Sequence, residues 1–353
     1  MRKAYRDLPH QPLRHDDTVS LQADLERLAK GGDFSGVIGL SRNGERFVEL
    51  HRGLADRANS RPIRLDSRFG IASVTKGLTA LTVASLIESG QLRYDTTLRR
   101  LLPRDLPMVD RRVTIEHLLG HTSGVGDYLD EETQVDIDDY VMDLPVHRLA
   151  DPADYLPLLD GHPQRSPPGS RFTYNNSGYV MLSIAAEVAG AASFYDLVQK
   201  RVLDPSGMAD TRFVRSDRLP ANAAIGYLRD GRSNVLHLPV RGAGDGGAYS
   251  TLSDLEALWP ALFAGRIVPL PTVERLVGPR SDVSKENRRY GLGFWLRPDR
   301  ETVWLEGMDA GVSCRTGYDR SSGLSYTVIS NTSSGAWPIV RYLEERLPSI
   351  ASG

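Results

Sequence analysis

Residues 69–79 read Phe69-Gly70-Ile71-Ala72-Ser73-Val74-Thr75-Lys76-Gly77-Leu78-Thr79 and lead directly into an apolar helical stretch. A serine and a lysine three residues apart lie on the same face of a helix, one turn from each other. If burial keeps Lys76 neutral, its amine can take the proton of Ser73 and create a nucleophile that attacks a carbonyl. The spacing therefore predicts an acylation site.

The segment from Val74 to Ser89 is apolar on nearly every side, which is typical of a helix buried in the centre of a protein. Gly90 follows it and suits the position just after a helix end. Ser73 is then expected at the N-terminus of a buried helix. Backbone N–H groups and the helix dipole favour a developing negative charge there.

The two ends of the chain predict a sheet. An amphipathic helix is expected over 20–30, and Asn43-Gly44 between two apolar runs is a strong signal for a β-hairpin. Strand patterns return near the other end, and a final helix is expected over 336–347. The expected strands there are 291–296, 301–305, 312–318 and 324–330. Sheet segments at both ends, with short helices between them, predict an α+β fold: an antiparallel sheet flanked by helices, with an inserted helical lobe.

This pattern also predicts the domain organisation. Residues 1–17 are polar and rich in Pro and His, which indicates a loosely held arm, and 346–353 are expected to form a tail. Residues 18–345 are expected to form a single catalytic domain. Its parts are a sheet lobe, 18–95 plus 243–345, and a helical lobe, 96–242.

Composition narrows the function. The net charge of −2 gives no electrostatic reason to bind nucleic acid or an anionic membrane. A single cysteine excludes an intramolecular disulfide, and no His-Glu-x-x-His spacing indicates a hydrolytic zinc site, so no metal or other cofactor is expected. The first residues are charged without an apolar stretch behind them. No segment approaches the roughly 18 apolar residues of a membrane span, which predicts a cytoplasmic protein.

Four further segments carry characteristic patterns in a fixed order. They are Val113-Thr114-Ile115-Glu116-His117-Leu118-Leu119-Gly120-His121-Thr122-Ser123-Gly124-Val125, Pro168-Gly169-Ser170-Arg171-Phe172-Thr173-Tyr174-Asn175-Asn176-Ser177-Gly178-Tyr179, Gly244-Asp245-Gly246-Gly247-Ala248-Tyr249-Ser250-Thr251-Leu252-Ser253-Asp254-Leu255 and Trp304-Leu305-Glu306-Gly307-Met308-Asp309-Ala310-Gly311-Val312-Ser313. Together with Ser-x-x-Lys they resemble the serine β-lactamase and penicillin-binding-protein superfamily over roughly residues 18–345. The closest likeness is to its class C-like branch of esterases, D-amino-acid peptidases and acyltransferases.

The resemblance implies a β-lactamase/transpeptidase-like fold and a role for each matching residue. Ser73 would be the acylated nucleophile and Lys76 its proton acceptor. Tyr174 and Asn176 match the family's Tyr-x-Asn motif. A phenol beside a lysine ammonium can have its pKa lowered, so Tyr174 would accept a proton from Ser73 or from water and return it to the leaving group. Asn176 would bind Lys76 and the substrate.

Two plainer interpretations stay open at this point. Tyr174 could be a core side chain, and Asn176 could be the N-cap of a helix that begins at Ser177. The histidine and serine of His121-Thr122-Ser123-Gly124 are interpreted as a structural loop. The glycine-rich 242–247 stretch is interpreted as a tight turn into a helix capped by Ser253.

The third motif departs from the family pattern. The resemblance implies Lys- or His-x-Gly on a strand that lines the site, and this chain has Leu305-Glu306-Gly307 there. The cation that helps to hold a substrate carboxylate is absent, so β-lactamase and carboxypeptidase activity are the less favoured options. Gly307 would still let substrate lie along the strand. The N–H of Met308, with that of Ser73, would form the oxyanion hole.

The sequence therefore predicts a serine hydrolase that cleaves a small-molecule ester or amide through a Ser73 acyl-enzyme, with a small-substrate esterase as the leading hypothesis. The alternatives are a D-amino-acid or peptide amidase or aminopeptidase, in which Glu306 attracts an ammonium group, and an acyltransferase that uses the same acyl-enzyme. A non-catalytic binding module is the remaining option. Oligomeric state stays open.

Overall fold

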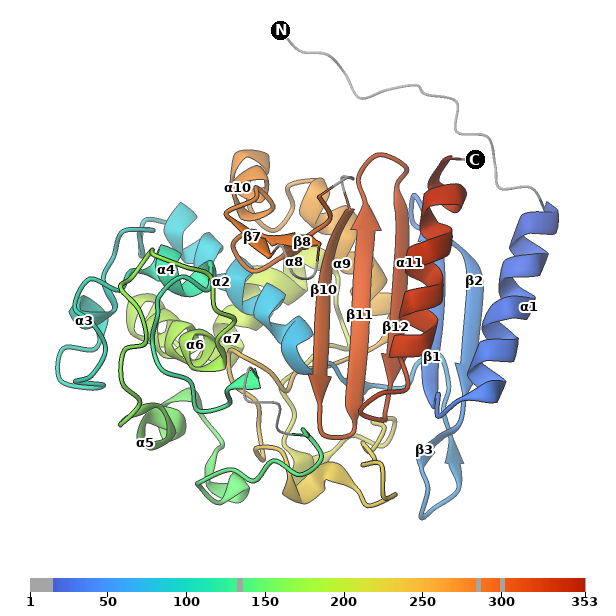
Figure 1. Ribbon diagram of the computed structural model, residues 1–353, viewed down its shortest axis with the longest axis horizontal. Coiled ribbons are helices and arrows are strands. Elements are labelled where there is room, and N and C mark those ends of the chain that lie inside the picture. Colours follow the sequence, from blue (N-terminus) through green and yellow to red (C-terminus); the bar gives the residue numbers. More distant parts are fainter. Residues whose placement is uncertain (1–14, 132–135, 284–286, 299–301, 353) are drawn as a thin grey trace, which may run out of the picture.

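The computed structural model describes residues 15–131, 136–283, 287–298 and 302–352 (Figure 1). Its centre is an eight-stranded antiparallel sheet with strand order β2-β1-β12-β11-β10-β9-β8-β7. The strands are β1 (Gly36–Arg42), β2 (Glu45–Arg52), β7 (Ser281–Val283), β8 (Arg288–Tyr290), β9 (Trp295–Leu296), β10 (Thr302–Asp309), β11 (Val312–Asp319) and β12 (Leu324–Ser330). Because β1 pairs directly with β12, both ends of the chain build one sheet, and the predicted α+β fold is confirmed.

The predicted hairpin forms β1 and β2. Asn43 and Gly44 adopt φ angles of 53° and 87°, which are the left-handed values that a tight two-residue turn requires. Side chains then alternate across β1: Val37 faces one hydrophobic core, and Ile38 and Leu40 face the other.

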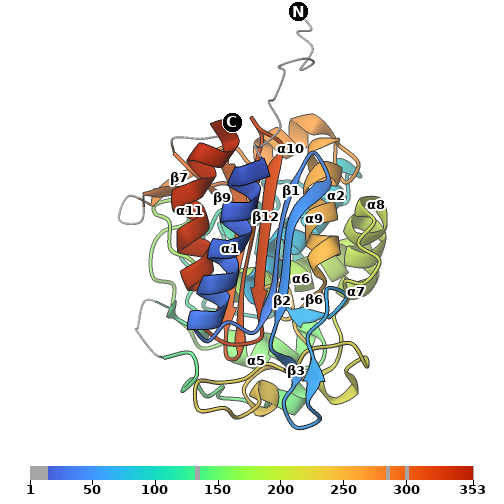
Figure 2. The ribbon, with the colours of Figure 1, turned by 90° about the vertical axis from the view of Figure 1, so that its right-hand side faces the viewer.

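Helices cover both faces of the sheet (Figure 2). On one face, α1 (His15–Gly31) and α11 (Trp337–Ser352) enclose a core that includes Leu25 and Leu343. On the other face lie α2 (Thr75–Glu88), α6 (Asn176–Gly190) and α9 (Leu252–Phe263), which share the larger core. Each fully buried leucine in these layers contributes about 1.5–3 kcal/mol.

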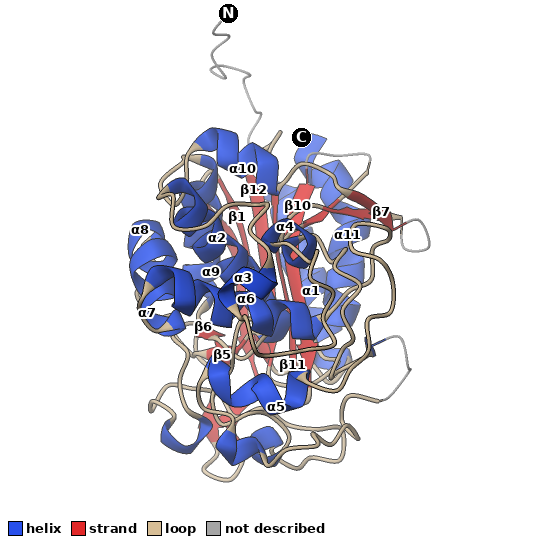
Figure 3. Cartoon of the chain, turned by 90° about the vertical axis from the view of Figure 1, so that its left-hand side faces the viewer, coloured by secondary structure: helices blue, strands red, loops and turns tan. Residues whose placement is uncertain are grey.

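The middle of the chain is mainly helical, and Figure 3 shows these helices in front of the sheet. The remaining helices are α3 (Leu98–Leu101), α4 (Ile115–Leu119), α5 (Leu156–Leu159), α7 (Phe194–Val198), α8 (Asp204–Ser206) and α10 (Leu270–Leu276). Two small ribbons stand apart from the main sheet: β3 (Leu54–Asp56) with β4 (Arg61–Pro62), and β5 (Phe69–Gly70) with β6 (Tyr249–Ser250). Short 3-10 or π turns lie between the helices, namely η3 (Val146–Arg148), η4 (Pro152–Tyr155), η5 (Gln199–Leu203), η6 (Ser216–Arg218) and η7 (Asn234–Leu236). The division into lobes at 95/96 and 242/243 stays a prediction.

Element ends differ from the predictions in two places. Helix α1 begins at His15, inside the predicted arm, whose residues 1–14 lie outside the described residues. Helix α11 continues to Ser352, past the predicted start of the tail at 346. In both helices, spaced apolar residues such as Leu21 and Ile339 anchor the helix on the sheet, and the helix continues beyond them.

Two local predictions are wrong. Only Trp295 and Leu296 of the expected strand 291–296 pair as β9, because Gly293 turns the chain with φ 100°. Helix α9 is capped by Thr251, whose side chain accepts the N–H of Asp254, and Ser253 does not cap it.

Within the described part of the chain, no single helix is long and apolar enough to cross a membrane. The bent pair Asn176–Gly190 and Phe194–Ser206, at 82° to each other, passes that test of length and composition as a unit.

Candidate active site

Ser73 lies on η1 (Ala72–Val74), a short 3-10 turn that runs directly into α2. The residue before it, Ala72, has φ 43°, a left-handed conformation that costs a non-glycine residue about 1–2 kcal/mol. Such strain persists only where the surrounding structure holds it. The turn leaves Ser73 partly exposed at the head of a buried helix, as predicted.

Lys76 is buried, with 2% of its surface exposed, and its ammonium has three hydrogen-bond partners. Nζ donates to Ser73 Oγ at 2.8 Å, to Asn176 Oδ1 at 2.7 Å and to the backbone carbonyl of Asp245 at 2.8 Å. Burial lowers the pKa of Lys76, and the nearby carboxylates, with that of Asp245 first, only partly offset this effect. The structure therefore brings the predicted pair together, and burial makes the ammonium of Lys76 easier to deprotonate than a lysine in water.

Tyr174 lies on the loop before α6 and reaches the same point. Its ring centre is 4.9 Å from Lys76 Nζ, and the side chain of Ser73 is close enough to its hydroxyl to lower the pKa of the phenol slightly against the larger effect of burial. The ring also stacks on Trp295 at 6.0 Å. Burial raises the pKa of Tyr174 well above its usual value, and the Glu131 charge adds to this, so the predicted lowering by lysine is wrong. The phenol is a proton donor near neutral pH.

The neighbouring residues Asn175 and Asn176 have different roles: the first caps a helix and the second binds Lys76. Asn175 caps α6 by accepting the N–H of Gly178 at 2.6 Å, so the alternative in which Asn176 is the cap is wrong. The amide oxygen of Asn176 accepts from Lys76, and its nitrogen donates to the carbonyl of Leu129 at 3.0 Å and to Glu131 at 3.1 Å. Asn176 is thus fixed toward the lysine.

Strand β10 runs beside the serine. It pairs with β9 only at Val303 and Trp304, so from Leu305 onward this edge has no ladder partner among the described strands. A Cβ at Gly307 would lie 2.5 Å from the backbone nitrogen of Ser73, which explains why only glycine fits. The half-exposed Met308 follows it and lines the same cavities as Ser73.

Leu305 and Glu306 occupy the positions where the resemblance implies the third motif. Leu305 is buried against Gly77 of α2. Glu306 is ion-paired with both Arg288 and Arg315. Burial alone would raise the pKa of Glu306, but these two guanidinium groups outweigh it and lower the pKa. The expectation that Glu306 attracts a substrate ammonium is therefore corrected, because the charge of Glu306 is already compensated by Arg288 and Arg315.

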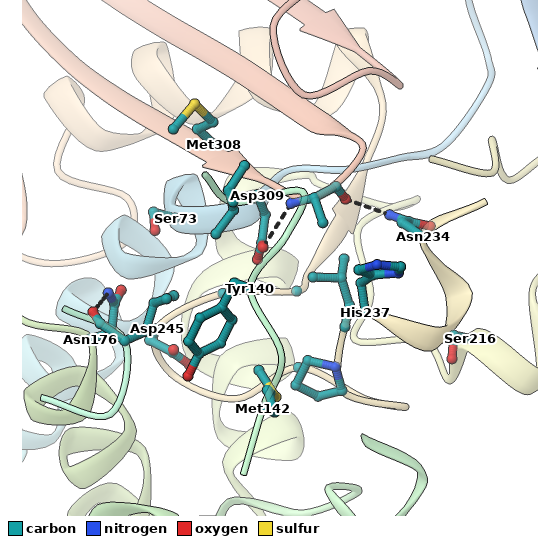
Figure 4. Close-up of a pocket in the computed structure, with 18 of the residues that line it drawn as sticks. Ser73, Tyr140, Met142, Asn176, Ser216, Asn234, His237, Asp245, Met308 and Asp309 are labelled. Atoms are coloured by element: carbon teal, nitrogen blue, oxygen red, sulfur yellow. Dashed lines mark hydrogen bonds between the residues drawn. The ribbon is translucent and has the colours of Figure 1, made fainter. Parts of the chain in front are cut away.

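Two cavities meet at Ser73. The first, which we call the narrow pocket, has a volume of about 60 Å³, and Figure 4 shows Ser73, Asn176 and Asp245 on one side of it and His237 on the other. The second, the open groove, has a volume of about 890 Å³ and is lined by Tyr174, among others. Ser73 lines both cavities, so a substrate that binds at Ser73 could extend into either of them.

The two cavities differ in charge. The narrow pocket is lined by the carboxyls of Glu131, Asp245 and Asp309, and none of its described lining residues is Lys or Arg. Burial raises the pKa of Asp309 to about 7, and burial also raises that of Asp245. The open groove is lined by three arginines with three acids, so its charge is mixed. These lining residues are Arg171, Arg288, Arg315, Glu131, Asp282 and Glu306.

Two functional residues were missed by sequence reasoning. Asp245 supplies a backbone carbonyl to Lys76, and Asp127 accepts the backbone N–H groups of Asn176 and Ser177 at 2.8 and 2.9 Å. The one available signal was the glycine-rich 242–247 stretch: a Cβ at Gly244 would lie 2.2 Å from the Tyr179 carbonyl, so this loop must pack tightly. Among the described residues, no group of three or more His, Cys, Asp or Glu side chains is arranged to hold a metal ion.

Comparison with known proteins gives a consistent result. A family model described as Beta-lactamase matches residues 21–344. A penicillin-binding protein of Bacillus subtilis is 29% identical over 82% of this chain, which spans 65% of that protein's length. Esterase EstB of Burkholderia gladioli is 29% identical over 79% of this chain and 77% of the esterase. The crystal structure of a penicillin-binding protein from Bacillus halodurans superposes with a TM-score of 0.85 and 34% identity, covering 91% of this chain and 99% of that one.

Proposed function

This chain belongs to the beta-lactamase family and is a serine hydrolase, and on that premise we propose that Ser73 is its nucleophile and that its substrates are small esters or amides. The observation that carries the proposal is the 2.8 Å contact between Lys76 Nζ and Ser73 Oγ, together with the burial that lowers the pKa of Lys76. A neutral lysine at that distance can accept the serine proton.

The proposed acylation uses the groups around Ser73 in turn. Lys76 takes the proton of Ser73 as the oxygen attacks the substrate carbonyl. The backbone N–H groups of Ser73 and Met308 receive the developing oxyanion, since β10 and η1 approach closely at Gly307. The phenol of Tyr174 donates its proton to the leaving alcohol or amine, and the proton on Lys76 replaces it. Water then attacks the acyl-enzyme and loses a proton to Lys76, and this proton passes to Ser73 Oγ as the acyl–oxygen bond breaks and the acid is released.

A fluorophosphonate probe tests the nucleophile. Intact protein is labelled, the adduct is located by mass spectrometry, and hydrolysis of a short-chain p-nitrophenyl ester is followed in parallel. We expect one adduct, on Ser73, with loss of activity in proportion to labelling, and neither labelling nor turnover in Ser73→Ala. An inactivated protein in which Ser73 is unmodified would refute the assignment.

A neutral small acyl group is the first candidate for the narrow pocket, because its volume of about 60 Å³ holds few heavy atoms. A second candidate is favoured by the charge of that pocket. The carboxyls of Asp245 and Asp309 lie beside the nucleophile, and a substrate with a small aminoacyl group would place its ammonium between them. In this second candidate, Asp309 and not Glu306 would bind the substrate ammonium in the amidase alternative.

Matched substrates and variants separate the two candidates. Acetyl and glycyl p-nitrophenyl esters differ mainly in the ammonium group. If the aminoacyl candidate is right, Asp309→Asn should lower kcat/KM for the glycyl ester by about tenfold or more and leave the acetyl ester within about twofold, as expected for loss of a partly buried ion pair. Glu306→Gln is the control and should affect both esters equally. If Asp309→Asn affects both esters equally, the aminoacyl candidate is rejected and the neutral ester remains as the only candidate substrate.

A further inference from the structure

His121 occupies an unusual position next to Tyr174. It is buried, with 1% of its surface exposed, and it has a left-handed φ of 54° just after helix α4. Its backbone carbonyl accepts the N–H of Thr173 at 2.8 Å, and its ring Nδ1 accepts the N–H of Asn175 at 3.1 Å. One residue therefore holds the chain on both sides of Tyr174.

The ring adds a third contact. Its centre is 4.4 Å from that of the Tyr174 ring, at an interplanar angle of 38°, and the rings of Tyr179 and Tyr290 pack against it at 4.9 and 4.8 Å. Nδ1 accepts a hydrogen bond, so the ring is neutral and carries its proton on Nε2. Nε2 has no hydrogen-bond partner in the described part of the molecule. Burial, with a smaller contribution from the Lys76 charge, also lowers the pKa of His121 well below its usual value.

These contacts argue against a base that acts on Ser73 directly. Nδ1 already has a backbone partner, and Nε2 is enclosed by aromatic side chains. They argue equally against a role in core packing alone, because a residue that only packs needs no hydrogen-bond acceptor directed at the N–H of Asn175. That N–H belongs to the cap of α6, the helix that begins with Asn176, so one acceptor aligns the cap and the preceding phenol together.

We propose that His121 is a positioning residue, which fixes the Tyr174 phenol on Ser73 through the backbone on either side of Tyr174 and through the packed ring. The proposal rests on the proposed function, in which Tyr174 is the proton donor to the leaving group. A displacement of about 1 Å at such a group can lower the rate by about 100-fold. The effect belongs to the chemical step and leaves substrate binding largely unchanged.

A double-mutant cycle with Tyr174→Phe tests the proposal, with an alkyl ester as substrate, because an alkoxide leaving group needs a proton whereas p-nitrophenolate leaves without one. We expect His121→Phe, which keeps a ring but removes the acceptor, to lower kcat by about 10–100-fold with KM within about threefold. His121→Asn can place an amide oxygen near Nδ1 and tolerates φ 54°, so it should retain about tenfold more activity than His121→Phe. In the Tyr174→Phe background, His121→Phe should cause no further loss.

His117 provides a matched control in the same segment. Its Nδ1 also accepts a backbone N–H, that of Thr114 at 3.3 Å, but within the described residues no hydrogen bond or ring contact joins His117 to Tyr174. His117→Phe should therefore combine additively with Tyr174→Phe. Additive losses for His121→Phe, or equal activity of His121→Phe and His121→Asn, would overturn the proposal.

The outcomes separate this proposal from the proposed function. If Ser73 is labelled and Tyr174→Phe is impaired but the cycle is additive, only the role of His121 fails. If Tyr174→Phe retains full activity, the proposed function fails at its proton donor. Thermal unfolding checks that each variant is folded, and His121→Ala repeats the cycle without a bulky ring if His121→Phe does not fold.

Discussion

At the scale of single residues, two opposing effects set the pKa of Lys76. Burial lowers it, and the charges of nearby carboxylates, that of Asp245 first, raise it. The pKa of Lys76 is lowered below the ordinary 10.5, whereas that of Tyr174 is raised. The two shifts suit the pair to opposite tasks, because deprotonation becomes easier for Lys76 and harder for Tyr174. A neutral amine accepts a proton, and a neutral phenol donates one.

Lys76→Arg separates charge from proton transfer. Arginine keeps a cation near Ser73 and Asn176 but does not lose its proton in proteins, so kcat should fall by about a thousandfold or more. In the wild-type enzyme, kcat/KM should rise with pH through an apparent pKa below 10.5, because the deprotonated amine is the active form. A rate profile between pH 5 and about 10 measures both. Retention of activity in Lys76→Arg, with the same ascending limb, would contradict the role of Lys76.

The sequence predicted which residues meet but not their protonation. The spacing of Ser73 and Lys76, with Tyr174 and Asn176 added by resemblance, identified four side chains that do converge. The sign of the Tyr174 shift could not be predicted, because burial depends on packing far along the chain. Asp245 contributes a backbone carbonyl, and no residue type encodes that contribution.

At the scale of elements, the close approach of β10 to η1 assembles the site. Leu305 packs on α2, and Gly307 lies against the backbone of Ser73, so the strand is held on the turn that carries the nucleophile. The hairpin at Asn43-Gly44 was predictable from a local signal, since the turn residues themselves require left-handed φ. The pairing of β10 was not, because the short length of its neighbour β9 depends on the turn at Gly293, and among the described strands no ladder partner continues beyond Trp304.

Gly307→Ala tests this approach. A Cβ there would lie 2.5 Å from Ser73 N and 2.6 Å from the carbonyl oxygen of Ile71, so strand and turn must separate. We expect a loss of about 100-fold in kcat/KM, which is comparable to removal of an oxyanion donor, with fluorophosphonate labelling slowed in parallel. Met308→Ala is the control: only its backbone N–H has a proposed role, so it should stay within about threefold. The reverse order of effects would contradict the placement of the oxyanion hole.

At the scale of the whole molecule, several carboxyl groups near the site have little contact with water: Asp127 and Asp245 are buried, and Asp309 is partly buried. Burial raises the pKa of Asp309 to about 7 and that of Asp127 to about 6. The folded protein therefore binds more protons than the unfolded chain between about pH 4 and 7. These groups lower the free energy of unfolding as pH rises through that window. Ionisation of these carboxyl groups therefore destabilises the folded protein near neutral pH, where the proposed reaction takes place.

Asp309→Asn should show this cost directly. The variant cannot ionise at this position, so it should exceed wild type in free energy of unfolding by about 2–4 kcal/mol at pH 8, and the difference should shrink toward pH 4. Denaturant unfolding at a series of pH values measures it. Asp110→Asn is the control and should show the opposite effect on the free energy of unfolding, because the Arg112 hydrogen bonds lower the pKa of Asp110 to about 2. A constant difference between Asp309→Asn and wild type across pH would contradict burial of an ionisable Asp309.

The pairing of β1 with β12 also determines when activity can appear. Gly36 is opposite Ser330, so a strand made early in synthesis waits for one made almost three hundred residues later. Ser73 and Lys76 leave the ribosome long before β10 has been translated. In the folded protein, β10 lies beside Ser73. A nascent chain therefore holds its reactive pair without an oxyanion hole for most of its elongation. Activity through the proposed site is therefore expected only after β10 has been translated.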